Sequence, residues 1–231
     1  MDNWNRTTEQ RKRGWRYLLE NVAVDVMLLQ ECVPPDDIDD RYNVLFRGIG
    51  DKRPWGSAIV TKDFPLKEIE FKNSYPGAVV AAEVTLPDGQ PLTVISLYGL
   101  FDEKNYVTAA MHRVLSDLTP LLHKDWNKRL LAVGGDYNLT TQWDERFKNR
   151  DPAHRIFFER LENFRLVNCT YKFFGQHVQT NRHSRSDFPW QNDYIHVSKR
   201  LAARLVSCEV RDDELVRELS DYNPVVAVFE M

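Results

Sequence analysis

The sequence contains few cysteines and no long apolar run. Its three cysteines, Cys32, Cys169 and Cys208, are odd in number and widely spaced, which suits a reduced cytoplasm better than a disulfide scaffold. No group of cysteines and histidines has the spacing of zinc ligands. No apolar run approaches the ~18 residues that span a bilayer, and the polar start of the chain lacks the apolar segment of a signal peptide. We therefore expect a cytoplasmic protein without a membrane partner.

A strong excess of one charge is also missing. The formal net charge is -3, so the overall charge does not indicate a nucleic-acid-binding protein. Basic residues gather locally instead, near positions 52–53, 148–150 and 182–185. Each such cluster alone is typical of solvated surface, and the clusters would hold a nucleic-acid strand only if they surround one site.

Internal repeats, low-complexity tracts and linkers are absent, so we expect a single domain that spans residues 1–231. The segment from Thr7 to Gln10 has the spacing of a capping box and predicts a helix that runs to about residue 22. An apolar face predicts a second helix over residues 105–123, and Asp151-Pro152 predicts the start of a third. Strands are predicted at residues 25–30, 56–61, 78–86, 92–98, 129–133, 193–197, 205–210 and 225–230. Two packed sheets with helices on their outer faces would satisfy this pattern.

Acidic or amide side chains end four of the apolar segments. These ends are Gln30-Glu31, Asp136-Tyr137-Asn138, Asn192-Asp193 and Asp221-Tyr222-Asn223. One such residue is ordinarily a turn former or a helix cap, but a carboxylate beside a buried strand is costly unless it is paired or binds a cation. Mg²⁺ prefers oxygen ligands, usually one or two carboxylates with water and phosphate. The segments together therefore predict a shared site for a hard cation.

The order of these segments resembles the motifs of the endonuclease/exonuclease/phosphatase superfamily. Residues 29–31 are similar to its LQE motif, 135–138 to GDxN, 192–195 to its late strand with an acid before an aromatic residue, and 220–225 to SDHxPV. Trp4-Asn5 and residues 54–59 match its early WN element and its glycine-led second strand. The resemblance implies a DNase I-like α/β fold, a four-layered sandwich of two mostly antiparallel sheets flanked by helices.

The resemblance also implies a phosphoesterase that uses Mg²⁺ or Mn²⁺. Glu31 would be the principal metal ligand, assisted by Asn5, with Asp221 as a further candidate. Only three residues precede Trp4, where superfamily members begin with an apolar strand, so the assignment of Asn5 is the less direct one. Thr7 stands where many members carry a second polar ligand, and we favour its interpretation as the helix cap.

The same resemblance assigns the catalytic residues. Asp136 and Asn138 would position the attacking water and the scissile phosphate. Asp193 would support the site, and Asp221 would orient the residue that follows it. Tyr98 ends a predicted strand where members often place a histidine or tyrosine, so it either faces the phosphate or packs in the core.

Position 222 departs from the motif, because Tyr222 stands where a histidine is expected. A phenol titrates near pH ~10 and is a poor base at neutral pH, although it can donate a hydrogen bond to a phosphate oxygen. Three interpretations stay open. The chain is a low-activity variant, natural or deliberately made, an active enzyme with Tyr222 as a donor, or a binding protein without catalysis.

Loops select the substrate in this superfamily, and the basic and aromatic residues near the motifs favour a nucleic acid. The candidate substrate-binding residues are Arg182, His183, Arg185, Trp55, Lys148 and Arg150. The sequence does not separate DNA from RNA, or endonuclease from exonuclease action. A small-molecule or lipid-headgroup phosphatase and a binding module of nucleic acid or protein are the alternatives.

Overall fold

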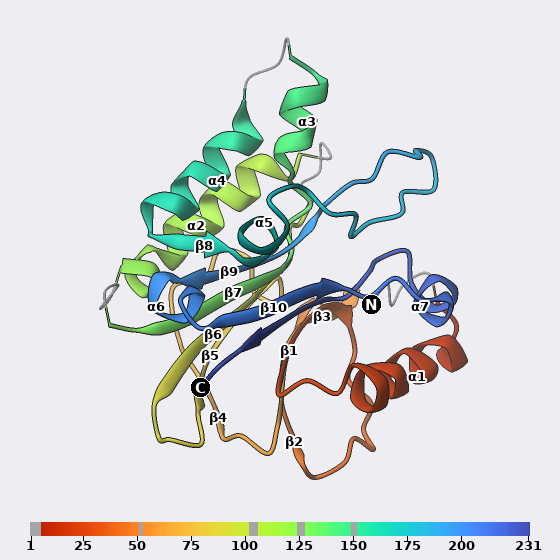
Figure 1. The fold of residues 1–231 in the computed structure, drawn as a ribbon. Coiled ribbons are helices and arrows are strands. Elements are labelled where there is room, and N and C mark those ends of the chain that lie inside the picture. Colours follow the sequence, from red (N-terminus) through yellow and green to blue (C-terminus); the bar gives the residue numbers. More distant parts are fainter. Residues whose placement is uncertain (1–5, 51–52, 102–105, 124–127, 149–151) are drawn as a thin grey trace.

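A six-stranded sheet forms one of two central layers of the protein. The computed structural model describes residues 6–50, 53–101, 106–123, 128–148 and 152–231 and is drawn in Figure 1. The strand order is β4-β5-β6-β7-β9-β8, and only the β6–β7 pair is parallel. In chain order the strands are β4 (Leu66–Glu68), β5 (Val79–Thr85), β6 (Pro91–Leu97), β7 (Leu130–Asp136), β8 (Leu166–Asn168) and β9 (Asp193–Ser198).

The second layer consists of two smaller antiparallel sheets that pack on the same face of the large sheet. One has the order β1-β3-β2 and the other pairs β10 with β11. Ile59 of β3, Val94 of β6 and Cys208 of β10 share one buried cluster, which fills the space between the layers. The strands are β1 (Val26–Cys32), β2 (Tyr42–Gly50), β3 (Arg53–Lys62), β10 (Leu205–Val210) and β11 (Val225–Phe229).

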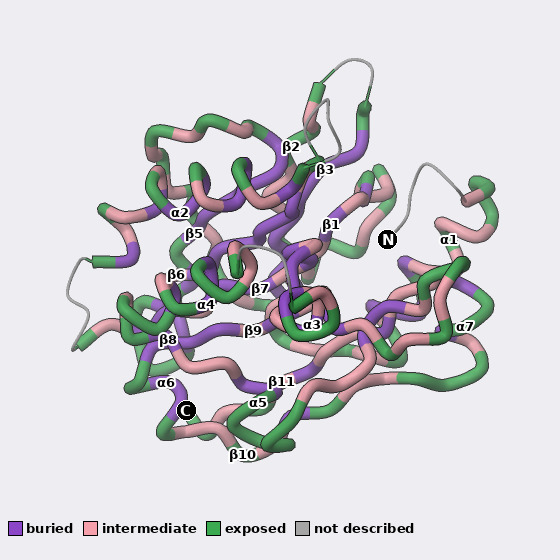
Figure 2. Tube along the Cα trace, turned by 90° about the horizontal axis from the view of Figure 1, so that it is seen from above, coloured by how far each residue is buried: buried purple, intermediate pink, exposed green. Residues whose placement is uncertain are grey.

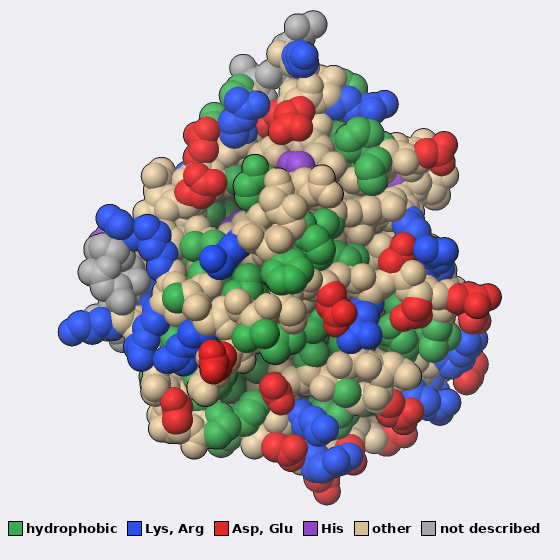
Figure 3. Space-filling model, in the orientation of Figure 1, with side chains coloured by type: hydrophobic (Ala, Val, Ile, Leu, Met, Phe, Trp, Pro, Cys, Tyr) green, Lys and Arg blue, Asp and Glu red, His purple; other side chains and the backbone are tan. Residues whose placement is uncertain are grey.

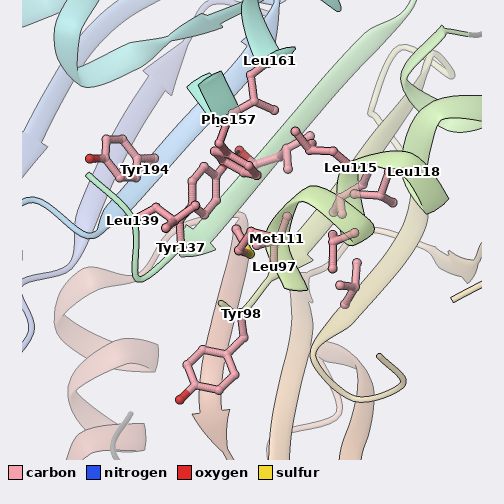
Figure 4. Packing of buried hydrophobic residues seen from close by; sticks show 14 of the residues in the cluster. Leu97, Tyr98, Met111, Leu115, Leu118, Tyr137, Leu139, Phe157, Leu161 and Tyr194 are labelled. Atoms are coloured by element: carbon pink, nitrogen blue, oxygen red, sulfur yellow. Dashed lines mark hydrogen bonds between the residues drawn. The ribbon is translucent and has the colours of Figure 1, made fainter. Parts of the chain in front are cut away.

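Helices cover both outer faces. On the large sheet, α2 (Thr108–His123) and α4 (Ala153–Asn163) bury Met111, Leu115 and Phe157 against β6 and β7 (Figure 4). On the small sheet, α1 (Thr8–Arg16) continues as a π-helix over Tyr17–Val22 and buries Trp15 against β1 and β3. The shorter helices are α3 (Thr141–Arg146), α5 (Cys169–Phe174), α6 (Lys199–Ala202) and α7 (Glu214–Leu219).

Burial on both faces explains the continuous apolar runs of the central strands. In β7, Leu131 and Val133 point to the helices, whereas Leu130 and Ala132 point to the other sheets. A strand covered on two faces has no polar side to alternate with. Figure 2 shows this as a buried centre inside an exposed periphery.

The predicted α/β sandwich is therefore confirmed. The capping box is confirmed as well: Thr7 Oγ1 accepts from the Gln10 backbone N–H at 3.2 Å, and Gln10 Oε1 accepts from the Thr7 N–H at 3.0 Å. The third helix begins one residue later than predicted, with Pro152 as its cap, and Asp151 lies outside the described residues. Among the described helices, none has both the length and the apolar character needed to cross a membrane.

Candidate active site

Four carboxylates gather at one end of the sandwich. They come from different elements: Glu31 from the end of β1, Asp136 from the end of β7, Asp193 from the start of β9 and Asp221 from the loop before β11. Asp136 and Asp193 are direct partners across the β7–β9 pair. Burial raises the pKa of Asp193, and the nearby charges of Asp136 and Asp221 raise it further. The structure thus brings together the acids that the motifs predict.

Asp136 is buried in a turn that its own side chain closes. Its Oδ1 accepts from the Asn138 backbone N–H at 2.9 Å, and its Oδ2 accepts from the Asn138 side-chain amide at 3.1 Å. The same amide donates to the Gly99 carbonyl at 3.0 Å, and Asn138 has a left-handed φ of 50°, which asparagine tolerates better than most residues. Burial raises the pKa of Asp136 to about 7, although the Asn138 N–H lowers it.

Gln30 fixes this turn from the facing sheet, a role that its motif does not predict. Its Nε2 donates to Ser96 Oγ at 2.8 Å, and its Oε1 accepts from the Asp136 backbone N–H at 3.3 Å. Gly135 makes room for this bridge, because a Cβ there would lie 2.6 Å from Gln30 Nε2 and 2.1 Å from the Leu97 carbonyl oxygen. The signal was present in the sequence as the polar residue that precedes Glu31.

Glu31 is held by Tyr98. The Tyr98 hydroxyl donates a hydrogen bond to Glu31 Oε1, and Figure 4 shows this hydroxyl directed away from the apolar cluster that holds the ring. Burial raises the pKa of Tyr98, and the charges of Glu31 and Asp136 raise it further, so the phenol stays protonated. Glu31 itself has a left-handed φ of 51° at an irregularity of β1. Such strained positions are frequent at functional sites.

Tyr222 lies among the acids with its hydroxyl toward Asp136. Burial raises its pKa, and the charges of Asp136, Asp193 and Glu31 add to the shift. The hydroxyl therefore keeps its proton, and its hydrogen bond to Asp136 stabilises the ionised carboxylate. The phenol is a donor in this site and cannot act as a base near neutral pH.

Trp55 and Arg182, which the sequence predicts to contact substrate, have structural contacts instead. Trp55 is 8% exposed and packs edge-on against Tyr98 at a centroid distance of 5.8 Å, so its ring is not presented for stacking on a base. The Arg182 guanidinium donates to the Ser220 carbonyl at 2.6 Å and to Asn223 Oδ1. Arg182 thereby braces the loop that carries Tyr222.

Among the described residues, no hydrogen bond or ion pair joins His183, Arg185 or Lys148 to the four carboxylates. His183 and Arg185 are exposed, and His183 Nδ1 accepts from the Arg185 backbone N–H at 3.1 Å. Lys148 is exposed beyond the end of α3. Figure 3 shows basic and acidic side chains interspersed over one face of the molecule. Asn5 and Arg150 lie outside the described residues.

The donor chemistry of the site fits a hard divalent cation. Asp193 Oδ2 is buried and has no hydrogen-bond partner, which is costly for a carboxylate oxygen unless a cation is near. Asp221 Oδ1 also has no hydrogen bond, and its cationic neighbour is Arg6, whose Nη2 lies 3.8 Å away. Within the described ranges, no three Asp, Glu, His or Cys residues lie close enough to share an ion. Mg²⁺ takes one or two carboxylates and fills its other positions with water and phosphate.

Comparison with solved structures identifies the fold. The chain superposes on an AP endonuclease from Archaeoglobus fulgidus with a TM-score of 0.72 and 20% identity, over 95% of this chain and 93% of that one. A 3' phosphatase, NExo, from Neisseria bound to a product DNA hairpin gives a TM-score of 0.74 and 18% identity, over 96% and 95% of the two chains.

A third solved structure is D. rerio TDP2 complexed with a single-strand DNA product. It gives a TM-score of 0.64 and 17% identity, over 100% of this chain and 96% of that one. Protein-family models and curated proteins give no match. A protein from Leptotrichia buccalis that matches with a TM-score of 0.63 is described as an endonuclease/exonuclease/phosphatase family protein. The chain has the fold of the endonuclease/exonuclease/phosphatase superfamily, as its motifs predict.

Proposed function

We propose that the chain is a divalent-metal-dependent phosphodiester hydrolase, and that its substrate is a nucleic acid. The observation that carries this proposal is the gathering of Glu31, Asp136, Asp193 and Asp221 at one end of the sandwich. Placing carboxylates beside one another, with Asp136 itself buried, destabilises a fold. A site that binds a divalent cation and hydrolyses a phosphoester requires carboxylates grouped in this way.

Glu31, together with Asn5 as the motif implies, would hold the Mg²⁺ or Mn²⁺ ion. A bound divalent cation stabilises the negative charge that develops on the phosphoryl and leaving oxygens. The hydrogen bond from Tyr98 fixes the orientation of the Glu31 carboxylate. Asp221, whose Oδ1 is buried without a hydrogen-bond partner, is a further candidate ligand.

Asp136 would act on the attacking water and its proton, and Tyr222 would act as a hydrogen-bond donor. With a pKa raised to about 7, the Asp136 carboxylate can orient a water for in-line attack and accept its proton near neutral pH. The Tyr222 hydroxyl remains protonated and can donate to Asp136 or to a phosphoryl oxygen. Asn138 holds Asp136 through two hydrogen bonds, so we assign it a positioning role.

Two similar structures support a nucleic acid as the substrate. NExo is described as bound to a product DNA hairpin and TDP2 as complexed with a single-strand DNA product. The fold itself is shared by different activities, so this likeness favours a nucleic acid without selecting DNA or RNA. A small-molecule or lipid-headgroup phosphatase stays the alternative with the same chemistry, and a binding module the alternative without it.

The proposal is tested by hydrolysis of labelled single- and double-stranded DNA and RNA. Each strand is incubated with the protein and Mg²⁺ or Mn²⁺, with excess chelator as the control. We expect metal-dependent cleavage of at least one of the four. Cleavage that persists in chelator would contradict the metal requirement. If none is cleaved, phosphate release from inositol phosphates and p-nitrophenyl phosphate would support the phosphatase alternative instead.

A further inference from the structure

Arg6 lies beside Asp221 at the edge of the acid cluster. Its Nη2 atom is 3.8 Å from Asp221 Oδ1, and its side chain is only 21% exposed. Arg6 directly precedes the capping box of α1, and the Asp221 carbonyl accepts from the Arg182 backbone N–H at 2.8 Å. The two residues flank α1 and α7, which pack side by side in Figure 1.

The charge of the cluster makes a cation at this position useful. A phosphate group that approaches Glu31, Asp136, Asp193 and Asp221 meets negative charge in a partly buried environment, where charge repulsion is weakly screened. A guanidinium has five N–H donors in a planar fork, so one arginine can contact a carboxylate and a phosphate oxygen at the same time.

We propose that Arg6 binds a phosphoryl oxygen of the substrate and that Asp221 orients Arg6 for this contact. The motif implies an imidazole at position 222, oriented by Asp221. Here Tyr222 turns its hydroxyl to Asp136, and the Asp221 carboxylate pairs with Arg6 instead. Arg6 thus supplies a positive donor where the imidazole is missing. This inference rests on the proposed phosphodiesterase function.

The test compares Arg6→Gln and Arg6→Lys with a matched control, Arg13→Gln. Arg13 also joins α1 to α7 through an ion pair, with Glu218 at 2.5 Å, but neither partner belongs to the acid cluster. The readouts are kcat/KM on labelled single-stranded DNA with Mg²⁺ and the inhibition constant of inorganic phosphate. Circular dichroism and thermal unfolding verify that every variant is folded.

Arg6→Gln is expected to lower kcat/KM about 10- to 100-fold, the effect of losing a hydrogen bond to a charged group, and to weaken phosphate inhibition. Arg6→Lys keeps the charge and is expected to recover part of both. Arg13→Gln is expected to change kcat/KM and the inhibition constant of phosphate by about twofold at most. Equal behaviour of the Arg6→Gln, Arg13→Gln and wild-type chains overturns the inference while the proposed function stands.

If the wild-type chain cleaves no nucleic acid, the proposed function fails, and the role of Arg6 in binding phosphate is tested separately. Equilibrium binding of inorganic phosphate in the presence of Mg²⁺ is then measured for the wild-type chain, Arg6→Gln and Arg13→Gln. Loss of binding in Arg6→Gln alone supports the anion site. Equal affinity in all three chains, or no binding to any of them, overturns it.

Discussion

At position 222 the site has a phenol where its motif implies an imidazole. Burial and the surrounding acids keep the Tyr222 hydroxyl protonated, so the residue can donate a hydrogen bond and cannot shuttle a proton. An imidazole titrates near pH ~6.5 and can do both. On the proposed function, this difference at one residue, with the acids retained around it, predicts slow phosphodiester cleavage.

Tyr222→His should therefore raise the rate of phosphodiester cleavage, by about 10²-fold if the imidazole restores general acid–base catalysis. Single-turnover cleavage of a labelled strand measures this rate. Tyr222→Phe serves as the control, since it removes the hydroxyl and adds no titratable group, and it should be slower than the wild-type chain. An unchanged rate in the histidine variant would show that position 222 takes no part in the reaction.

Asp136 should make the stability of the metal-free protein depend on pH. Its pKa rises from 3.8 to about 7 on folding, mainly through burial. Between these values the unfolded chain has lost the proton that the folded chain keeps, so stability falls as pH rises from about 4 to 7 and levels off above. Asp136→Asn lacks this titration.

The measurement is urea unfolding of both chains in chelator at pH 4.5 and pH 8. The quantity compared is the free energy of unfolding of Asp136→Asn minus that of the wild-type chain. This difference should be about 2–4 kcal/mol larger at pH 8 than at pH 4.5. Parallel pH profiles of the two chains would mean that Asp136 is not desolvated in the folded state.

At the scale of elements, the two central layers are joined at the site by a close approach of β1 to β7. Gly135 has a φ of +140°, and a Cβ there would lie 2.6 Å from Gln30 Nε2 of β1 and 2.1 Å from the Leu97 carbonyl oxygen of the adjacent strand β6. Gln30 occupies the remaining space and holds the Asp136 backbone. The position of Asp136 thus depends on packing between the sheets as well as on its own turn.

Gly135→Ala should destabilise the protein by about 2–4 kcal/mol, because a Cβ must displace backbone in addition to straining φ. Gly89→Ala is the matched control, since Gly89 also has positive φ (+79°) but no atom within 4 Å of the added Cβ. Its cost should stay near 1 kcal/mol. Thermal or urea unfolding measures both, and equal costs would contradict the close approach.

Arg182 shows the same dependence between two loops. Its guanidinium donates to the Ser220 carbonyl at 2.6 Å and to Asp212 at 3.1 Å, so it contributes to the stability of the loop that carries Tyr222. The sequence could not show this, because both partners lie about 30 to 40 residues further along the chain. In the sequence, an arginine that braces a loop cannot be told from an arginine of a polar loop that binds a phosphate.

Arg182→Met should lower the free energy of unfolding by about 1–3 kcal/mol, since it leaves the part-buried Ser220 carbonyl and Asn223 Oδ1 without this donor. Arg217→Met is the control, because Arg217 pairs with the same Asp212 at 2.9 Å but is exposed, and its loss should cost about 0.5 kcal/mol or less. If Arg182 only contacted substrate, its removal would weaken binding and leave stability unchanged.

At the scale of the whole molecule, the sequence predicted the architecture and the acid cluster better than the surfaces around them. The strands that form the buried centre are continuous apolar runs, and the predicted ranges agree with β1, β3, β5, β6, β7 and β9 to β11. β2 (Tyr42–Gly50) was missed because none of its residues is fully buried, so its apolar pattern is weak.

The contacts around the acids were the least predictable part. Trp55 looked suited to stacking on a base, and its burial against Tyr98 depends on how β3 packs beside β6. Arg6 gave no signal beyond its charge, since its partner Asp221 lies at the other end of the chain. Motif order is local information, whereas these contacts arise only when distant elements meet.

The most direct test of the account is the single-turnover cleavage rate of a labelled single strand by Glu31→Gln and the wild-type chain, with saturating Mg²⁺. Glu9→Gln, an exposed glutamate of α1, controls for the loss of one charge. A cation supplies several kcal/mol of transition-state stabilisation, so Glu31→Gln should be slower by about 10³-fold or more, and Glu9→Gln should match the wild-type chain. Equal rates in all three would contradict a metal-dependent phosphodiesterase site at the end of β1.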